Sequence, residues 1–236
     1  MAWREGVSPD GSDSTAEEVA PRDHWPEMHT LICVVSDAKK GMSSTSGMQN
    51  TVGTSPLLQH RLTLVPGRMK EIEGAIQARD FDTFARITMA DSNQFHAVCL
   101  DTAPPIFYLN DVSRSIIVLV EEINRASIAA GEGYVAAYTF DAGPNAVIYA
   151  LEKNIPTVIS AVNWFFPTKQ PFDDPFGMAT MEVPMPKGFE AGVIRAGGWE
   201  KGAVKSLIHT RVGDGPRILE SKDSLLGEDG MPKIMA

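Results

Sequence analysis

Residues 139–145 hold the side chain whose type and position most clearly favour chemistry. Asp141 directly follows the apolar run 134–140, which predicts a buried strand, so the carboxylate is placed at the strand's carboxyl end. Gly143 and Pro144 allow a tight turn there. A carboxylate at this point suits a general base or an ion partner. Alternatively, it only caps a helix that we expect to start at 146–151. The residues alone leave both interpretations open.

A polar loop at 39–47 is the second candidate, with the sequence Lys-Lys-Gly-Met-Ser-Ser-Thr-Ser-Gly. Hydroxyls and backbone N–H groups of such a loop can hold a phosphate. Its glycine and lysine order is not that of a Walker loop. The hydroxyls of Ser43, Ser44 and Thr45 are therefore candidate anion ligands. The alternative is a solvated polar loop without a ligand.

Histidines and cysteines predict no metal site. Asp91, Asn93 and His96 share a predicted helix, but their spacing does not bring them onto one stripe, and we interpret His96 as a structural histidine. The other histidines are scattered along the chain. Cys33 and Cys99 lie among aliphatic residues, which predicts buried, reduced thiols of a cytosolic protein.

The elements that must position these groups are strands interleaved with helices, which predicts an α+β or α/β class. Strands are expected at 31–36, 134–140 and 204–212, with another near 178–183. Helices are expected over 48–65 with a break at Pro56, over 66–78, from an Asp80 cap to Pro104, and over 113–129. Periodicity is poor over 154–199, which predicts an irregular segment, and its aromatic side chains are interpreted as packing groups (Trp164, Phe165, Phe166 and Phe172).

Composition limits the classes of protein and partner. The chain has 236 residues, a net charge of −9, 43% hydrophobic and 22% charged residues, which is typical of a folded globular protein. The acidic balance argues against nucleic acid or an anionic membrane surface as a partner. No apolar run approaches the ~18 residues of a membrane span. The acidic first thirty residues do not resemble a signal peptide, so we expect a cytoplasmic protein.

Several ordered blocks give the chain a family resemblance. They are Val-Val-Ser-Asp-x-Lys-Lys-x-x-Ser-Ser-Thr-x-Gly-Met-Gln from 34, Asp-Ser-Asn-x-Phe-His-Ala from 91, Pro-Pro-Ile-x-Tyr-x-Asn from 104, Ala-Tyr-Thr-Phe-Asp-Ala-Gly-Pro-Asn-Ala from 137, and Ile-His-Thr-Arg-Val-Gly-Asp-Gly-Pro from 208. These blocks resemble the eukaryotic diphosphomevalonate decarboxylases, and the last one suits the fungal members. The resemblance implies the fold of the small-molecule kinase superfamily of galactokinase, homoserine kinase and mevalonate kinase. This chain would be its α+β carboxyl-terminal domain, of ferredoxin-like type.

The resemblance also implies a reaction and its residues. These enzymes use ATP and Mg²⁺ to phosphorylate the 3-hydroxyl of (R)-5-diphosphomevalonate, and loss of phosphate and CO₂ gives isopentenyl diphosphate for isoprenoid and sterol biosynthesis. Asp141 matches the catalytic aspartate, which orients or deprotonates that hydroxyl. Ser44 and Thr45, grouped here with Ser43, match hydroxyls that hold the substrate's diphosphate. Members of the family form homodimers, so a homodimer or association with a full-length homologue is expected.

The match begins part-way into the family sequence. Residues 2–6 resemble the end of the helix that follows the family's ATP phosphate loop, and the loop itself has no counterpart here. We therefore expect a remnant or linker of the amino-terminal domain at 1–24, the decarboxylase domain at 25–218 with a divergent segment at 154–199, and a tail at 219–236. No residue is predicted to bind ATP, and this chain alone should turn over negligibly. Alternatives are one half of a split enzyme, or a non-catalytic diphosphate-binding or interaction module.

Overall fold

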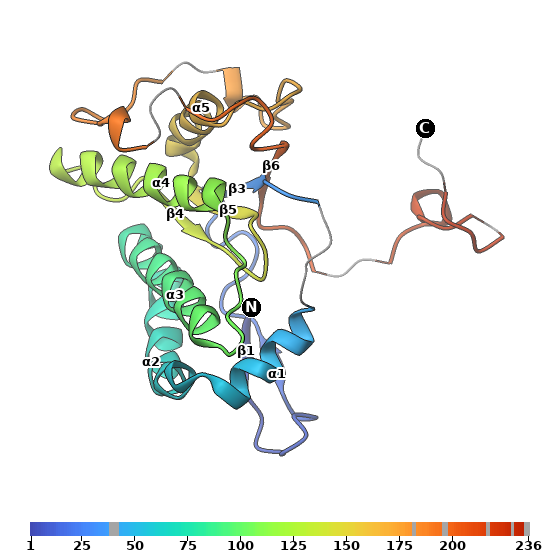
Figure 1. Ribbon diagram of the computed structural model, residues 1–236. Coiled ribbons are helices and arrows are strands. Elements are labelled where there is room, and N and C mark those ends of the chain that lie inside the picture. Colours follow the sequence, from blue (N-terminus) through green and yellow to red (C-terminus); the bar gives the residue numbers. More distant parts are fainter. Residues whose placement is uncertain (38–42, 181–182, 195–197, 216–217, 228, 234–236) are drawn as a thin grey trace.

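The centre of the molecule is a four-stranded antiparallel sheet. The computed structural model describes residues 1–37, 43–180, 183–194, 198–215, 218–227 and 229–233 (Figure 1). The sheet has the strand order β4-β5-β3-β6. Its strands are β3 (Met28–Val34), β4 (Ala136–Thr139), β5 (Ala146–Leu151) and β6 (Ser206–Arg211). Strands from both halves of the chain therefore pair into one sheet, which confirms the α+β prediction.

The described residues form five α-helices. They are α1 (Ser44–Thr54), α2 (Pro56–Ala78), α3 (Phe81–Asp101), α4 (Asp111–Ala129) and α5 (Ile155–Phe165). Of these, α3, α4 and α5 contact the sheet. In Figure 1, α4 and α5 lie in the upper half and α1, α2 and α3 in the lower half. None of the helices in the described ranges is long and apolar enough to cross a membrane.

Local sequence signals set the ends of the two longest buried helices. The Asp80 side chain accepts a hydrogen bond from the Thr83 backbone N–H and so caps α3, as predicted. Asn110 and Ser113 form a reciprocal capping box at the start of α4. Each such cap stabilises a helix by about 1 kcal/mol, because it satisfies backbone donors that the first helical turn leaves free.

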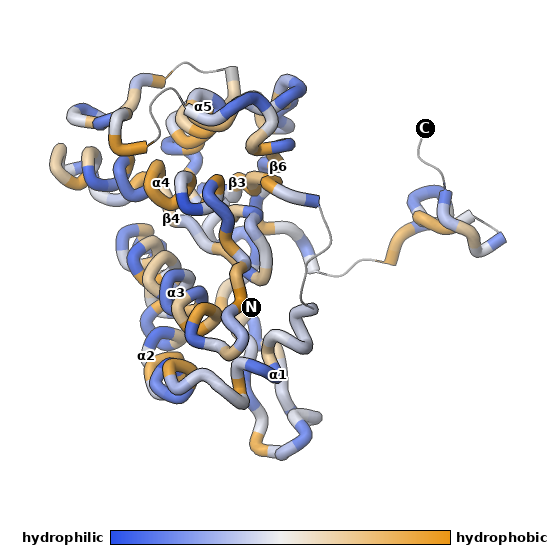
Figure 2. Tube along the Cα trace, in the orientation of Figure 1, coloured by the Kyte–Doolittle hydropathy of each residue, from blue (hydrophilic) through white to orange (hydrophobic). Residues whose placement is uncertain are grey.

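The core packs one face of the sheet against α4 and α5. Leu31 and Cys33 of β3 and Ile148 of β5 are fully buried, and they alternate with partly exposed residues on the opposite face. The same cluster contains fully buried side chains of the two helices (Ile116, Leu119, Ile123, Ile155 and Ile159). Figure 2 shows hydrophobic residues recurring along α4 and α5. Both cysteines are buried and unpaired, as expected.

The helix expected at 146–151 is wrong, because this segment is strand β5. Its six residues alternate between buried and half-buried, and they pair with β3 on one side and β4 on the other. A short apolar run does not distinguish a helix from a strand by its own pattern. With a strand after Asp141, the interpretation of this residue as a helix cap is also wrong.

Two further expectations fail in the first third of the chain. Residues 2–6 do not end a helix, because Ala2–Arg4 is strand β1, which pairs with β2 (Thr15–Glu17). Helix α2 also runs through Pro66 instead of starting there. Pro66 is exposed, so water can satisfy the carbonyl oxygen that loses its helical N–H partner.

The segment 154–199 is more ordered than its periodicity predicted. It opens with α5, whose Trp164 is 78% exposed and so does not pack in the core, whereas Phe165 and Phe166 do. The strand expected near 178–183 is wrong for Met178–Thr180, which form a 3₁₀ turn, and residues 181–182 lie outside the described ranges. A buried polar chain holds the segment on the sheet: the nearest ring nitrogens of His29 and His209 lie 2.9 Å apart, and His209 Nδ1 is 2.6 Å from Asp174 Oδ1.

Candidate active site

The turn between β4 and β5 presents Asp141 at the surface. The Gly143 N–H donates to the Asp141 carbonyl oxygen at 2.8 Å, which closes the turn. Neighbouring helices hold its two flanks. The Phe140 N–H donates to Ser92 Oγ of α3 at 3.1 Å, and Ser113 Oγ of α4 donates to the Pro144 carbonyl oxygen at 2.8 Å. The backbone around the carboxylate is therefore fixed from two sides.

Asn145 ties this turn to strand β3. Its side-chain Oδ1 accepts two backbone hydrogen bonds, from Val35 at 2.8 Å and from Ser36 at 2.9 Å. Those two N–H groups lie just past the end of β3, where the chain leaves toward residues 43–45. Ser43 follows Ser36 by seven positions, so their Cα atoms lie at most about 25 Å apart.

His96 and Tyr108 are the titratable neighbours of Asp141. His96 Nε2 lies 3.4 Å from the Phe140 carbonyl oxygen, and its ring packs edge-on against Tyr108. Burial lowers the pKa of His96, although the Phe140 carbonyl and the Asp141 charge oppose this. Burial, with the charges of Cys99 and Asp141, raises the pKa of Tyr108. Both side chains are thus neutral at neutral pH, and no ion pair joins Asp141 to another described residue.

The predicted anion loop is largely the start of a helix. Ser43 is the N-cap of α1, and its Oγ accepts a hydrogen bond from the Ser46 N–H at 3.1 Å. Ser44 and Thr45 occupy the first turn with exposed side chains. Free N–H groups and the positive end of the helix dipole favour an anion at such a terminus. Lys39 and Lys40, the two cations expected in this loop, lie outside the described residues.

Helix α1 is anchored through its other end. The hydroxyls of Thr51 and Thr102 lie 2.8 Å apart, and Thr54 Oγ1 accepts a hydrogen bond from the Ala103 N–H at 2.9 Å. At the following residue, Ser55 Oγ donates to Asp101 at 2.7 Å. All three partners lie at the end of α3 or directly after it, and α3 also holds the Asp141 turn through Ser92. One helix therefore supports both predicted site segments.

A protein-family model, the mevalonate 5-diphosphate decarboxylase C-terminal domain, matches residues 30–219. The chain belongs to this family. Its relatives include the diphosphomevalonate decarboxylases of Ganoderma lucidum, with 57% identity over 99% of this chain and 59% of the relative, and of Schizosaccharomyces pombe, with 46% identity over 100% and 57%. The chain thus spans somewhat more than half the length of these relatives.

Solved structures agree with this assignment. The mevalonate diphosphate decarboxylase from Trypanosoma brucei superposes with a TM-score of 0.79 at 33% identity, covering 95% of this chain and 59% of that one. A structure described as MDDEF in complex with MVAPP, AMPPCP and magnesium gives a TM-score of 0.59 at 30% identity, over 68% of this chain and 47% of that one. The decarboxylase family and the α+β C-terminal fold inferred from the sequence blocks are therefore confirmed.

Two features of the site were not predicted from the sequence. Asn145 was part of a recognised block, but its role as a double acceptor depends on backbone groups 110 and 109 positions away in the chain. Asp91 was considered as a metal ligand and rejected, whereas in the structure it joins α2 to α3 through Arg61 and Arg68. Neither arginine lies in one of the sequence blocks that indicated the family. Their ion pairs with Asp91 form only when α2 and α3 pack together, so the sequence pattern did not indicate them.

Proposed function

We propose that this chain supplies the catalytic carboxylate and the diphosphate-binding hydroxyls of a diphosphomevalonate decarboxylase. The reaction is the ATP-dependent phosphorylation and decarboxylation of (R)-5-diphosphomevalonate to isopentenyl diphosphate, a step of isoprenoid and sterol biosynthesis. One observation carries the proposal: Asn145 joins the rigid turn of Asp141 to the strand end that leads to Ser43, Ser44 and Thr45.

In this proposal, the Asp141 carboxylate accepts a hydrogen bond from the 3-hydroxyl of the substrate and takes its proton as phosphoryl transfer proceeds. The carboxylate suits this role because it is exposed, has no cation partner among the described residues and stands on a fixed turn. The substrate's diphosphate would bind at the amino end of α1, where hydroxyls and free N–H groups offer donors.

Among the described residues, no group of three or more His, Cys, Asp or Glu could hold a metal ion. We assign no step through Mg²⁺ or ATP to the described side chains. ATP as the phosphoryl donor, with Mg²⁺, is proposed for the family protein as a whole. The MDDEF structure in complex with MVAPP, AMPPCP and magnesium supports this part of the proposal.

A chimera tests the function. The amino-terminal part of the Ganoderma lucidum relative is fused ahead of this chain, and phosphate release from ATP is measured with diphosphomevalonate. We expect turnover by the chimera, negligible turnover by this chain alone, and a loss of about 10²- to 10⁴-fold on Asp141→Asn. Asp173→Asn, an exposed carboxylate elsewhere, is the matched control and should keep full activity.

The alternatives have their own outcomes. Turnover that survives Asp141→Asn unchanged would refute the assigned role. Turnover restored by adding the amino-terminal part as a separate chain would instead indicate a split enzyme. Binding of diphosphomevalonate without turnover in any combination would favour a non-catalytic module.

We also propose that the protein works in the cytoplasm and forms a homodimer. Two unpaired, buried cysteines support a reducing compartment, and burial raises the pKa of the Cys33 thiol to about 12, which leaves it unreactive. The mass in solution, measured by light scattering, checks the dimer.

A further inference from the structure

A cavity of about 330 Å³ lies between α2, α3 and the sheet. Neither Asp141 nor the three hydroxyl residues of α1 line it. Its walls are mostly apolar, with Val65, Met69 and Ile72 from α2, Phe84 and Ile87 from α3, and Tyr149 from β5. Small-molecule sites in proteins have this size and character: an apolar body with a few placed polar groups.

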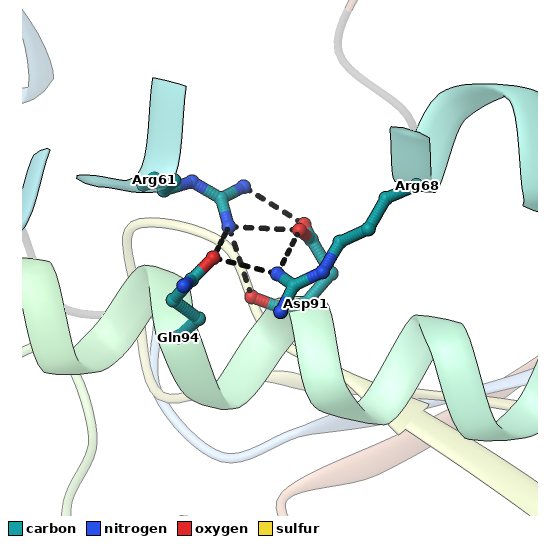
Figure 3. Close-up of polar contacts among 4 residues, drawn as sticks. All are labelled: Arg61, Arg68, Asp91 and Gln94. Carbon is teal, nitrogen blue, oxygen red and sulfur yellow. Dashed lines mark hydrogen bonds and ion pairs between the residues drawn. The ribbon is translucent and has the colours of Figure 1, made fainter. Parts of the chain in front are cut away.

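Two arginines and one carboxylate also line this cavity. Arg61 makes a two-pronged ion pair with Asp91, with N–O distances of 2.7 and 2.8 Å, and Arg68 reaches the same carboxylate at 3.0 Å (Figure 3). Both guanidinium groups also donate to Gln94 Oε1, at 3.1 and 2.6 Å. Figure 3 shows the two groups converging on Asp91 from separate turns of α2.

The charges of this cluster do not balance. Two guanidinium groups share a single carboxylate, which leaves one positive charge. The arginine side chains are only 15% and 24% exposed, so water screens their mutual repulsion incompletely. Partial burial acts to raise the pKa of Asp91, but the hydrogen bonds and charges of Arg61 and Arg68 outweigh it and hold that pKa below its usual value. The carboxylate therefore stays ionised, and a second anion would complete the pairing.

The hydroxyl of Thr88 is a second observation that indicates a ligand in this cavity. Thr88 Oγ1 is buried, and it has no hydrogen-bond partner within the described part of the chain. It lies one turn before Asp91 on α3 and lines the same cavity. A buried polar group without a partner is rare in a native protein and calls for an explanation. A bound ligand with an oxygen atom near Thr88 would satisfy it.

We propose that this cavity binds a small carboxylic acid with an apolar chain of medium length. The carboxylate would pair with Arg61 and Arg68, because one negative charge cancels the one excess positive charge. Its chain would lie among Val65, Ile72 and Phe84. This site is separate from the proposed decarboxylase site, and it does not depend on that activity.

Calorimetric titration of the whole chain with three probes tests the site. Hexanoate carries both the charge and the chain, 1-hexanol only the chain, and acetate only the charge. We expect saturable one-to-one binding of hexanoate, and at least ten-fold weaker binding of each of the other two. Arg68→Gln should lower the affinity for hexanoate at least ten-fold. Arg86→Gln removes an exposed arginine of α3 that pairs with Glu71, and it should change that affinity less than two-fold.

Three results would overturn the proposal: no saturable binding of hexanoate, equal binding of 1-hexanol, or equal affinity of Arg68→Gln and the parent chain. Circular dichroism checks that Arg68→Gln is folded. If it is not, backbone NMR shifts of the parent chain decide. Hexanoate must then shift Thr88 and Thr139 at the cavity, and shifts confined to other regions refute the site.

Discussion

The turn that carries Asp141 and the helix end that carries Ser43, Ser44 and Thr45 are built in opposite ways. Side chains of α3 and α4 bond to the turn around Asp141, and the Val35 backbone N–H just past β3 bonds to it as well. At the amino end of α1, the Ser43 side chain bonds to Ser46 of the first turn and to no other described residue, and its described neighbours are exposed.

This difference fits the two roles proposed for these segments. The backbone on both sides of Asp141 is held in place without a substrate, as the proposed role in proton transfer would require. The hydroxyls stand at an open helix terminus, where an anionic ligand itself would supply the missing partners. Changes at the turn should therefore reduce the stability of the fold, and changes at the helix end should mainly reduce anion binding.

Replacing Asn145 should have the largest effect on stability. Asn145→Ala leaves the N–H groups of Val35 and Ser36 without their acceptor, so we expect unfolding to become easier by about 1–3 kcal/mol. Urea denaturation measures this. Asn145→Asp keeps an acceptor oxygen and should recover most of the loss. A neutral result for Asn145→Ala would remove the basis for a fixed turn.

Ser113→Ala should have the next largest effect. The change removes the hydrogen bond to the Pro144 carbonyl oxygen and one half of the capping box of α4, at a cost of about 1–2 kcal/mol. The same denaturation experiment measures it. Ser115→Ala, an exchange on the same helix with no hydroxyl bond to the turn, serves as control. Equal costs for the two variants would contradict the anchoring role of Ser113.

Ser43→Ala should separate the two regions. Loss of the N-cap should destabilise the chain by only about 1 kcal/mol, because helix α1 is held through its other end. Pyrophosphate binding, followed by calorimetry, should weaken several-fold, whereas Asn145→Asp should leave it unchanged. Unaltered pyrophosphate affinity in Ser43→Ala would show that the helix end is not the anion site.

Acidification should lower the stability of the fold through His96, which lies beside the Asp141 turn. This effect should be smaller than those of the three substitutions above. The pKa of His96 is lower in the folded chain than in the unfolded chain, where it is about 6.5. The unfolded chain therefore binds more protons on acidification, and stability that is complete above pH ~6.5 falls as the pH drops through the folded pKa. His96→Gln should lose less stability than the parent chain between pH 7 and 5, as measured by thermal unfolding. Burial and the charge of His209 also lower the pKa of His29. Part of the acid sensitivity therefore remains in both the parent chain and His96→Gln.

Predictions from the sequence succeeded where the signal is local and failed where partners are distant. The cap at Asp80 depends on a hydrogen bond across three residues, so the residue type alone indicated the start of α3. The strand β5 was mistaken for a helix, because only pairing with β3 and β4 distinguishes the two. Asp141 and the hydroxyls of 43–45 were candidates from their residue types and positions. The family blocks gave them specific roles, which stay predictions until the chimera is measured.

The sequence by itself determined the family, the mixed class of the fold, the cap of α3, and the position of Asp141 after a strand. These depend on residue identity and on contacts a few positions apart. Only the tertiary structure decided that Asn145 bridges two strands and that Arg61 and Arg68 share Asp91 beside a cavity. Those arrangements join residues from about 20 to more than 100 positions apart, and their charges and donors find partners only when burial of the apolar faces brings the helices and the sheet together.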